Sequence, residues 1–117
     1  MKKSEKLYLV HIVEASDKLK NYLPNTLEEL AKNEMAQDAI IKNLANITES
    51  ASNLEDMSKN NYPNIPWQKI RGMRNILVHD YLGDLSCDEL WKTVRNDLPS
   101  LVDVARKILK EKYGQDI

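Results

Sequence analysis

The sequence is poor in residues that interrupt regular structure and in residues that anchor disulfides or metals. It holds three glycines, four prolines, one cysteine and no phenylalanine among 117 residues. The single Cys87 excludes an internal disulfide. His11, His79 and Cys87 show no metal-ligand spacing, and no H-E-x-x-H pattern is present, so the sequence argues against a metalloenzyme. The scarcity of glycine and proline predicts few, long elements.

The chain also lacks an excess of charge of either sign. Its formal net charge is −1, with 30% charged and 42% hydrophobic residues, which is typical of a soluble helical protein. Attraction to a nucleic acid must therefore come from a local cationic cluster. No apolar run is long enough to cross a bilayer and no signal peptide is visible, so we expect a cytoplasmic protein without membrane contact. The length predicts one domain, residues 1–117.

Apolar residues recur at helical spacing along the chain, and no stretch alternates as a strand does. This pattern predicts an all-α, up-and-down bundle of four to five helices. We expect helices over 4–22, from Leu27 to about Met57, over 67–79, from about Cys87, and a last one over 101–109 that stops at Gly114. Ser4 is a candidate N-cap, and the pairs Thr26–Glu29 and Ser86–Glu89 have the spacing of capping boxes.

Prolines and charges indicate how these helices are separated. Ser58–Pro66 contains two prolines and is predicted to be a polar loop, with Pro66 in the first turn of the next helix. Asp97 and Pro99 predict a break or kink before the last helix. Lysines near the end of that helix are expected to face solvent: Lys107, Lys110 and Lys112.

The stretch from Arg71 to Tyr81 has the most distinctive chemistry. On a helix at about 100° per residue, the apolar Ile70, Met73, Ile76 and Leu77 fall on one side. We expect Arg71, Arg74, Asn75 and His79 on the opposite side. Arg71, Asn75 and His79 form a row at i, i+4 and i+8, and Arg74 flanks it. Apolar Val78 and Trp67 lie near this row, which suggests a face covered by a second subunit.

Two guanidiniums, an amide and an imidazole suit a phosphodiester. Arginine offers a planar fork of donors that matches phosphate oxygens, and histidine transfers protons near neutral pH. That pair needs no metal to move an RNA 2′-hydroxyl onto its own phosphate. The simpler alternative is that Arg74 and His79 stabilise the C-terminus of the helix, where positive charge is favourable.

The segment Arg74-Asn-Ile-Leu-Val-His79-Asp-Tyr81 resembles the Arg-x4-His-x-Tyr motif of HEPN-domain ribonuclease toxins, most of all the HepT-like family. The resemblance extends over nearly the whole chain. Tyr62-Pro-Asn-Ile-Pro-Trp67 resembles the segment before the motif, and Asp97-Leu-Pro-Ser-Leu101 resembles the entry to the last helix. One departure lies in the second helix, where Ile47-Thr-Glu-Ser50 stands for the common Ile-Gly-Glu-Ala.

The resemblance implies a function and a set of roles. It implies a homodimeric toxin of a type VII-like toxin–antitoxin system that cleaves RNA without a cofactor. Arg74 and His79 would be catalytic, with Arg71 and Asn75 in support, and the antitoxin, a minimal nucleotidyltransferase, would transfer AMP onto Tyr81. Glu49 is retained, and it is either a solvated carboxylate or a partner of Arg71 or Arg74.

A non-catalytic alternative remains open at this stage. Arg71, Arg74 and His79 would then hold a dimer together or bind a nucleotide. In that case the protein would be a helical interaction module that positions a nucleotidyltransferase partner.

Overall fold

The computed structural model describes residues 4–79 and 86–117, with the side chains of Val78 and His79 excepted. Within these ranges the chain is helical and contains no strand, which confirms the all-α prediction. The elements are α1 (Glu5–Lys20), α2 (Leu27–Ala31), α3 (Glu34–Ser52), α4 (Asp56–Asn60), α5 (Trp67–His79), α7 (Cys87–Lys92), a π-helical segment (Thr93–Asp97) and α8 (Leu98–Tyr113).

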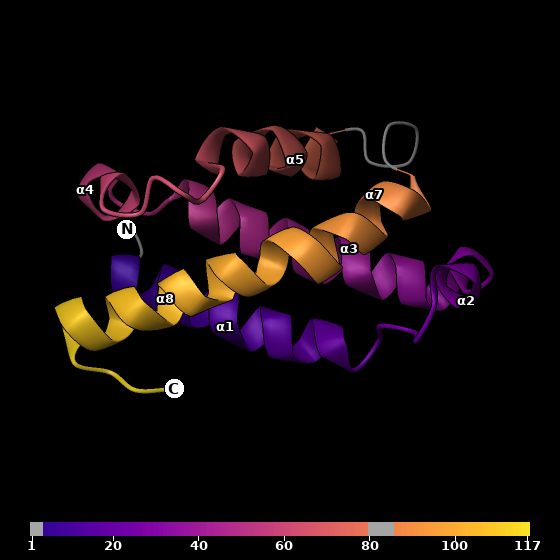
Figure 1. Cartoon of the computed structure of the whole chain (residues 1–117), viewed down its shortest axis with the longest axis horizontal. Coiled ribbons are helices and arrows are strands. Elements are labelled where there is room, and N and C mark those ends of the chain that lie inside the picture. The colour runs from indigo at the N-terminus through magenta and orange to yellow at the C-terminus, as the bar shows by residue number, and fades with distance from the viewer. Residues whose placement is uncertain (1–3, 80–85) are drawn as a thin grey trace.

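Helix α3 is the centre of the arrangement. It packs against α1 along one side and against α5 along another, while α8 packs along α1 (Figure 1). The short α2 and α4 lie at opposite ends of α3 (Figure 1). No helix that the structure describes is both long enough and apolar enough to span a bilayer.

The core is aliphatic, as expected of a chain without phenylalanine. Five side chains with no exposed surface are contributed by α1 and α3: Leu9, Ile12, Leu19, Ile40 and Ile47. Residues from α8 close the core from the other side, among them Leu109, also with no exposed surface. Burial of such side chains is the main favourable contribution to folding.

The predicted helix starts and the predicted stop are confirmed. Ser4, Thr26 and Ser86 each accept a hydrogen bond from the backbone N–H three residues ahead, at 3.3, 3.1 and 3.2 Å. Gly114 ends α8 with a φ of 62°, a left-handed conformation that glycine adopts without steric cost. These caps satisfy backbone groups that a helix end leaves without partners.

The long helix predicted from Leu27 to Met57 is wrong in its extent. The chain leaves the helix after Ala31, and α3 begins afresh at Glu34. Asn33 caps α3 by accepting a hydrogen bond from Ala36 N at 3.0 Å. The apolar periodicity continues through this break, so the helical pattern concealed an N-cap for which asparagine is well suited.

Two boundaries in the second half also differ from the prediction. The predicted loop 58–66 contains the end of a short helix, α4, and Pro66 directly precedes α5. At Asp97 and Pro99 the chain does not break, because a π-helical segment links α7 to α8 and Pro99 lies in the first turn of α8, where its missing N–H is not needed.

Lys112 is exposed, as predicted, with 38% of its side-chain surface accessible, but its ammonium group is paired across the fold. Its ammonium group donates to Glu5 Oε1 at 2.7 Å and to Glu55 Oε1 at 2.9 Å. Tyr113 donates its hydroxyl proton to Glu5 Oε1 at 2.6 Å, and Glu55 N donates to Glu5 Oε2 at 2.8 Å. We call Glu5, Glu55, Lys112 and Tyr113 the Glu5 cluster; it joins α1, the start of α4 and the end of α8.

Candidate active site

Helix α5 carries the candidate residues, and its first residue fixes its position. The indole N–H of Trp67 donates to the carbonyl oxygens of Lys59, at 3.1 Å, and Tyr62, at 3.0 Å. The ring is half-buried against the core. Trp67 is therefore the packing anchor that a tryptophan at a helix start commonly provides, with its polar edge satisfied by backbone.

The apolar side of α5 faces α3 as predicted. Leu77 is buried with 3% of its surface exposed, and Ile70 and Met73 are half-buried against the same core. Arg71 and Asn75 are exposed on the other side of the helix. One face of α5 therefore packs on the core, and the other face carries exposed polar side chains.

Arg74 does not lie opposite the core, contrary to its predicted place. On a helical projection it falls only about 40° from Ile70, at the edge of the packed face. Its side chain is 32% exposed and reaches α3, where Arg74 Nε donates to Glu49 Oε2 at 2.5 Å. Its Nη1 donates to Asn75 Oδ1 at 3.0 Å. Arg74, Glu49 and Asn75 form what we call the Arg74 cluster.

Charge pairing sets the protonation of this cluster. The hydrogen bond from Arg74 lowers the pKa of Glu49, against the opposing effect of burial, and the Asn53 amide adds a weaker contribution by donating to Glu49 Oε1 at 3.2 Å. The same hydrogen bond raises the pKa of Arg74. Glu49 is therefore an anion that holds a permanent cation in a defined orientation.

The guanidinium retains donors for a further ligand. Of the five N–H groups of an arginine, the contacts with Glu49 and Asn75 use two. Because Nε is bound to Glu49 and Nη1 uses one proton on Asn75, one proton of Nη1 and both of Nη2 remain as donors, and the Nη1–Nη2 end of a guanidinium is a planar fork that phosphate oxygens match. The cluster can thus bind an oxyanion without releasing Glu49.

The structure does not bring all predicted site residues together. Arg71 borders a separate hollow of about 590 Å³, bounded by the end of α3, by α4 and by the start of α5, together with Lys59 and Asn60. His79 is the last residue of α5, one turn beyond Asn75, and its side chain lies outside the described part of the structure. Tyr81 also lies outside the described residues.

Of the two departures beside Glu49, Thr48 turns its hydroxyl away from the carboxylate. Thr48 donates to the carbonyl oxygen of Leu44 at 2.9 Å within α3, and Ser50 is buried. Sequence reasoning missed Asn53, which supports Glu49 from the next turn; the i, i+4 spacing was the signal that could have found it. Among the described residues, no group of three or more His, Cys, Asp or Glu side chains is placed to hold a metal.

The model of the family described as "Ribonuclease HepT-like" matches residues 12–108. The chain belongs to the HepT-like ribonuclease family. It is 35% identical over 111 residues to the "Probable ribonuclease HepT" of Thermococcus cleftensis, covering 94% of this chain and 100% of that protein.

A second relative is a longer protein of Methanocaldococcus jannaschii, named "Gamma-glutamylcyclotransferase and putative RNase", with 34% identity over 113 residues. The match covers 95% of the HepT-like chain but 50% of that protein, so the chain spans about half of its length. No solved structure matches the chain significantly.

Proposed function

We propose that this protein is a metal-independent endoribonuclease. The observation that carries the proposal is the Arg74 guanidinium, held at Nε by Glu49 and at Nη1 by Asn75 and followed five residues later by His79, in a chain of a ribonuclease family. The names of the relatives support RNA as the substrate.

Arg74 binds the scissile phosphate and stabilises the charge that develops on it. An arginine already fixed by Glu49 and Asn75 loses little side-chain freedom when the substrate binds, and a preorganised donor is more effective in the transition state than a mobile one. Glu49 and Asn75 are positioning residues in this scheme, and Arg71 assists phosphate binding from the exposed side of α5.

His79 transfers the proton. The RNA 2′-oxygen attacks the adjacent phosphorus, the bond from phosphorus to the 5′-oxygen breaks, and a 2′,3′-cyclic phosphate and a 5′-hydroxyl result. As general base His79 takes the proton of the 2′-hydroxyl, and as general acid it protonates the leaving 5′-oxygen. A homodimer that brings two copies of α5 together supplies one imidazole for each role.

Tyr81 is the proposed switch. A nucleotidyltransferase antitoxin transfers AMP from ATP: the tyrosine oxygen attacks the α-phosphorus, and pyrophosphate leaves. The added phosphate, two residues after His79, competes with RNA for the guanidiniums. We expect a mass gain of one AMP after co-expression with the antitoxin, and we expect Tyr81→Phe to abolish it. A gain that survives Tyr81→Phe would place the modification elsewhere.

The rival candidate is a non-catalytic interaction module. The observation that favours it is that Arg74 is already paired with an anion, as in a purely structural contact. In that case the HepT-like chain dimerises and positions its nucleotidyltransferase, and neither Arg74 nor His79 affects any RNA.

The deciding experiment is cleavage of total cellular RNA in EDTA by the unmodified wild type and by His79→Asn, with the 5′ and 3′ ends of the products analysed. Asparagine keeps a hydrogen-bonding side chain but cannot shuttle a proton near neutral pH. We expect cyclic phosphate ends from the wild type and a loss of at least about 100-fold in the variant. Cleavage at the wild-type rate by His79→Asn contradicts the role of His79, and an inactive wild type favours the interaction module.

A further inference from the structure

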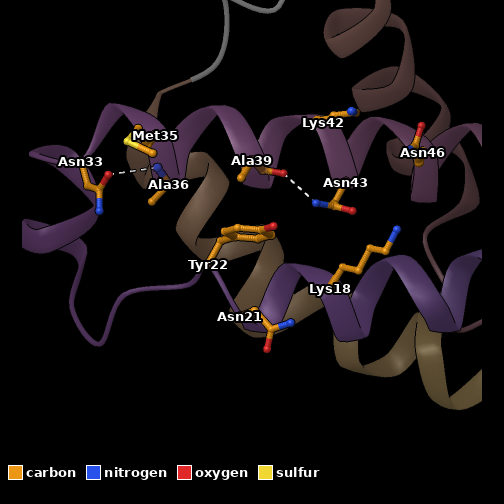
Figure 2. A pocket seen from close by; sticks show the side chains of 10 residues that line it. All are labelled: Lys18, Asn21, Tyr22, Asn33, Met35, Ala36, Ala39, Lys42, Asn43 and Asn46. Atoms are coloured by element: carbon orange, nitrogen blue, oxygen red, sulfur yellow. Dashed lines mark hydrogen bonds between the residues drawn. The ribbon is translucent and has the colours of Figure 1, made fainter.

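A continuous groove runs along the face between α1 and α3. It consists of two hollows, of about 560 and about 450 Å³, whose linings share three residues: Lys18, Asn43 and Asn46. Figure 2 shows the first hollow with Lys18 rising from α1 and Asn43 facing it from α3. We call the two hollows together the α1–α3 groove.

The wall of the first hollow is cationic and rich in amides. Lys18 and Lys42 are the charged side chains among its described lining residues, and no carboxylate is among them. Asn21, Asn33, Asn43 and Asn46 supply donors and acceptors. An apolar partner would leave these groups without hydrogen bonds, whereas an anionic, hydrogen-bonding ligand would use them.

Two lining side chains have features suited to a strand of nucleic acid. Tyr22 is 50% exposed, and its ring lies between the two helices (Figure 2), where a base can stack on it. Asn43 is only 9% exposed and is fixed by donating to Ala39 O at 2.9 Å, which leaves its amide oxygen as an oriented acceptor. Unpaired bases are recognised by such stacking and edge contacts.

The groove leads to the Arg74 cluster. The second hollow is lined by two carboxylates, Glu14 and Glu49, as well as by Lys18, and Glu49 is the residue that holds Arg74. Met35, in the first hollow, and Glu49 lie fourteen positions apart on α3, about 21 Å at roughly 1.5 Å per residue. At roughly 3.4 Å per stacked nucleotide, this distance accommodates about six nucleotides.

We propose that the α1–α3 groove binds the single-stranded RNA that flanks the cleavage site. This inference rests on the proposed function and adds to it a track for the substrate outside the Arg-x4-His motif. Lys18 and Lys42 contact phosphates, the asparagines contact base edges and Tyr22 stacks on one base. Because the chain is close to neutral overall, the two lysines of the first hollow supply local attraction that its net charge of −1 does not, while the carboxylates Glu14 and Glu49 confine that attraction to the first hollow.

The test measures binding of a 2′-O-methyl RNA oligonucleotide, which lacks the attacking hydroxyl, by fluorescence anisotropy over a range of salt concentrations. The variant Lys18→Ala/Lys42→Ala is compared with Lys107→Ala/Lys110→Ala, which removes two exposed lysines of α8 and the same charge. We expect the groove variant to bind about tenfold more weakly, with the slope of log K against log salt reduced by about 1.4, since each phosphate contact on a single strand contributes about 0.7.

Two further arms support or overturn the inference. Lys18→Arg/Lys42→Arg keeps both charges and should restore the salt slope. Adding up to about six nucleotides on one side of a cleavable substrate should raise the wild-type cleavage rate. The same extension should not raise the cleavage rate of Lys18→Ala/Lys42→Ala. Tyr22→Ala should weaken binding about fivefold or more relative to Tyr22→Phe.

The outcomes separate this inference from the proposed function. A wild type that binds and cleaves RNA, with the groove variant unchanged in affinity and slope, overturns the groove and leaves the ribonuclease intact. A wild type that neither binds nor cleaves overturns both. If the groove variant changes the oligomeric mass measured by light scattering, the face is an interface between two copies, and the inference is wrong.

Discussion

The Glu5 cluster and the Arg74 cluster are built from the same chemistry, a carboxylate held by a cation from a distant helix, yet they differ in what remains open. The side chain of Glu5 is 2% exposed, and three protein donors, from Glu55, Lys112 and Tyr113, converge on its two oxygens. The side chain of Glu49 is 45% exposed, and the Arg74 guanidinium keeps most of its donors.

This difference separates a structural contact from a candidate site. A carboxylate whose acceptors are satisfied within the fold can only stabilise the fold, because it has no further capacity for a ligand. A guanidinium that is held at Nε and Nη1 and keeps three further N–H donors is both oriented and available. The contrast predicts that changes in the Glu5 cluster alter stability and spare activity, and that changes in the Arg74 cluster do the reverse.

The largest effect on stability is expected from Glu5→Ala. Removing the buried carboxylate leaves Tyr113 and Glu55 N without their acceptor and Lys112 with Glu55 alone, which should lower the free energy of unfolding in urea by about 2–3 kcal/mol. Glu28→Ala is the matched control, because Glu28 is an exposed acid in the first turn of α2 and experiences the same kind of helix dipole. If Glu5→Ala and Glu28→Ala lowered the free energy of unfolding equally, the Glu5 cluster would stabilise the fold no more than an exposed carboxylate does.

The same cluster predicts how stability depends on pH. The hydrogen bonds from Lys112, Tyr113 and the backbone of Glu55 outweigh burial, which opposes them, and lower the pKa of Glu5 from 4.5 to about 2. The folded state thus holds this proton more weakly than the unfolded chain does, so the stabilisation is complete above about pH 5 and is lost as the pH falls towards 2.

Urea unfolding of the wild type and of Glu5→Gln between pH 7 and pH 3 measures this loss. We expect the wild type to lose stability more steeply than the variant over the acidic part of this range, since only the wild type has the titrating carboxylate. Parallel curves for the two proteins would show that Glu5 does not titrate with the pKa that its contacts give it.

A smaller, purely functional effect is expected from Glu49→Gln. Glutamine keeps the length of the side chain but loses the charge that orients the guanidinium, so we expect kcat for RNA cleavage to fall about tenfold. The unfolding free energy should change by less than about 1 kcal/mol, because the pair is half-exposed. A loss of stability without a change in kcat would make Glu49–Arg74 a structural pair like Glu5–Lys112.

The smallest effect concerns Asn53, the C-cap residue of α3, whose amide donates to the backbone oxygen of Glu49 at 2.8 Å as well as to its carboxylate. Asn53→Ala removes the hydrogen bond of 3.2 Å to Glu49 Oε1 and should lower kcat about twofold to threefold, with KM unchanged. Ser52→Ala, a neighbouring change that spares Glu49, is the control. An effect of Asn53→Ala as large as that of Glu49→Gln would mean that Asn53 contacts the substrate itself.

The sequence predicted those features whose determining residues lie within a few positions of one another in the chain. The bounds of α5 follow from Pro66 and from the apolar spacing, and the caps at Ser4, Thr26 and Ser86 follow from patterns within one turn. The break at Asn33 was missed because Met35 continues the apolar spacing of the sequence across it, although the side chain of Met35 is 83% exposed.

Long-range pairing had no local signature. Glu5 and Lys112 are 107 residues apart, so no spacing rule indicates their contact, and the sequence predicted the exposure of Lys112 but not its ion pair. From the sequence, Glu49 was either a solvated carboxylate or a partner of Arg71 or Arg74. In the structure it accepts a hydrogen bond from Arg74, because Arg74 lies at the edge of the packed face of α5. Residue type alone could not distinguish this position from that of Arg71.

The most direct test of the account measures two quantities on one variant, Arg74→Ala, beside Arg95→Ala as an exposed arginine outside the cluster. The account predicts that RNA cleavage in EDTA falls at least about 100-fold in Arg74→Ala while its unfolding free energy stays within about 1 kcal/mol of the wild type. Cleavage that persists in Arg74→Ala, or a loss of stability comparable to that of Glu5→Ala, would contradict it.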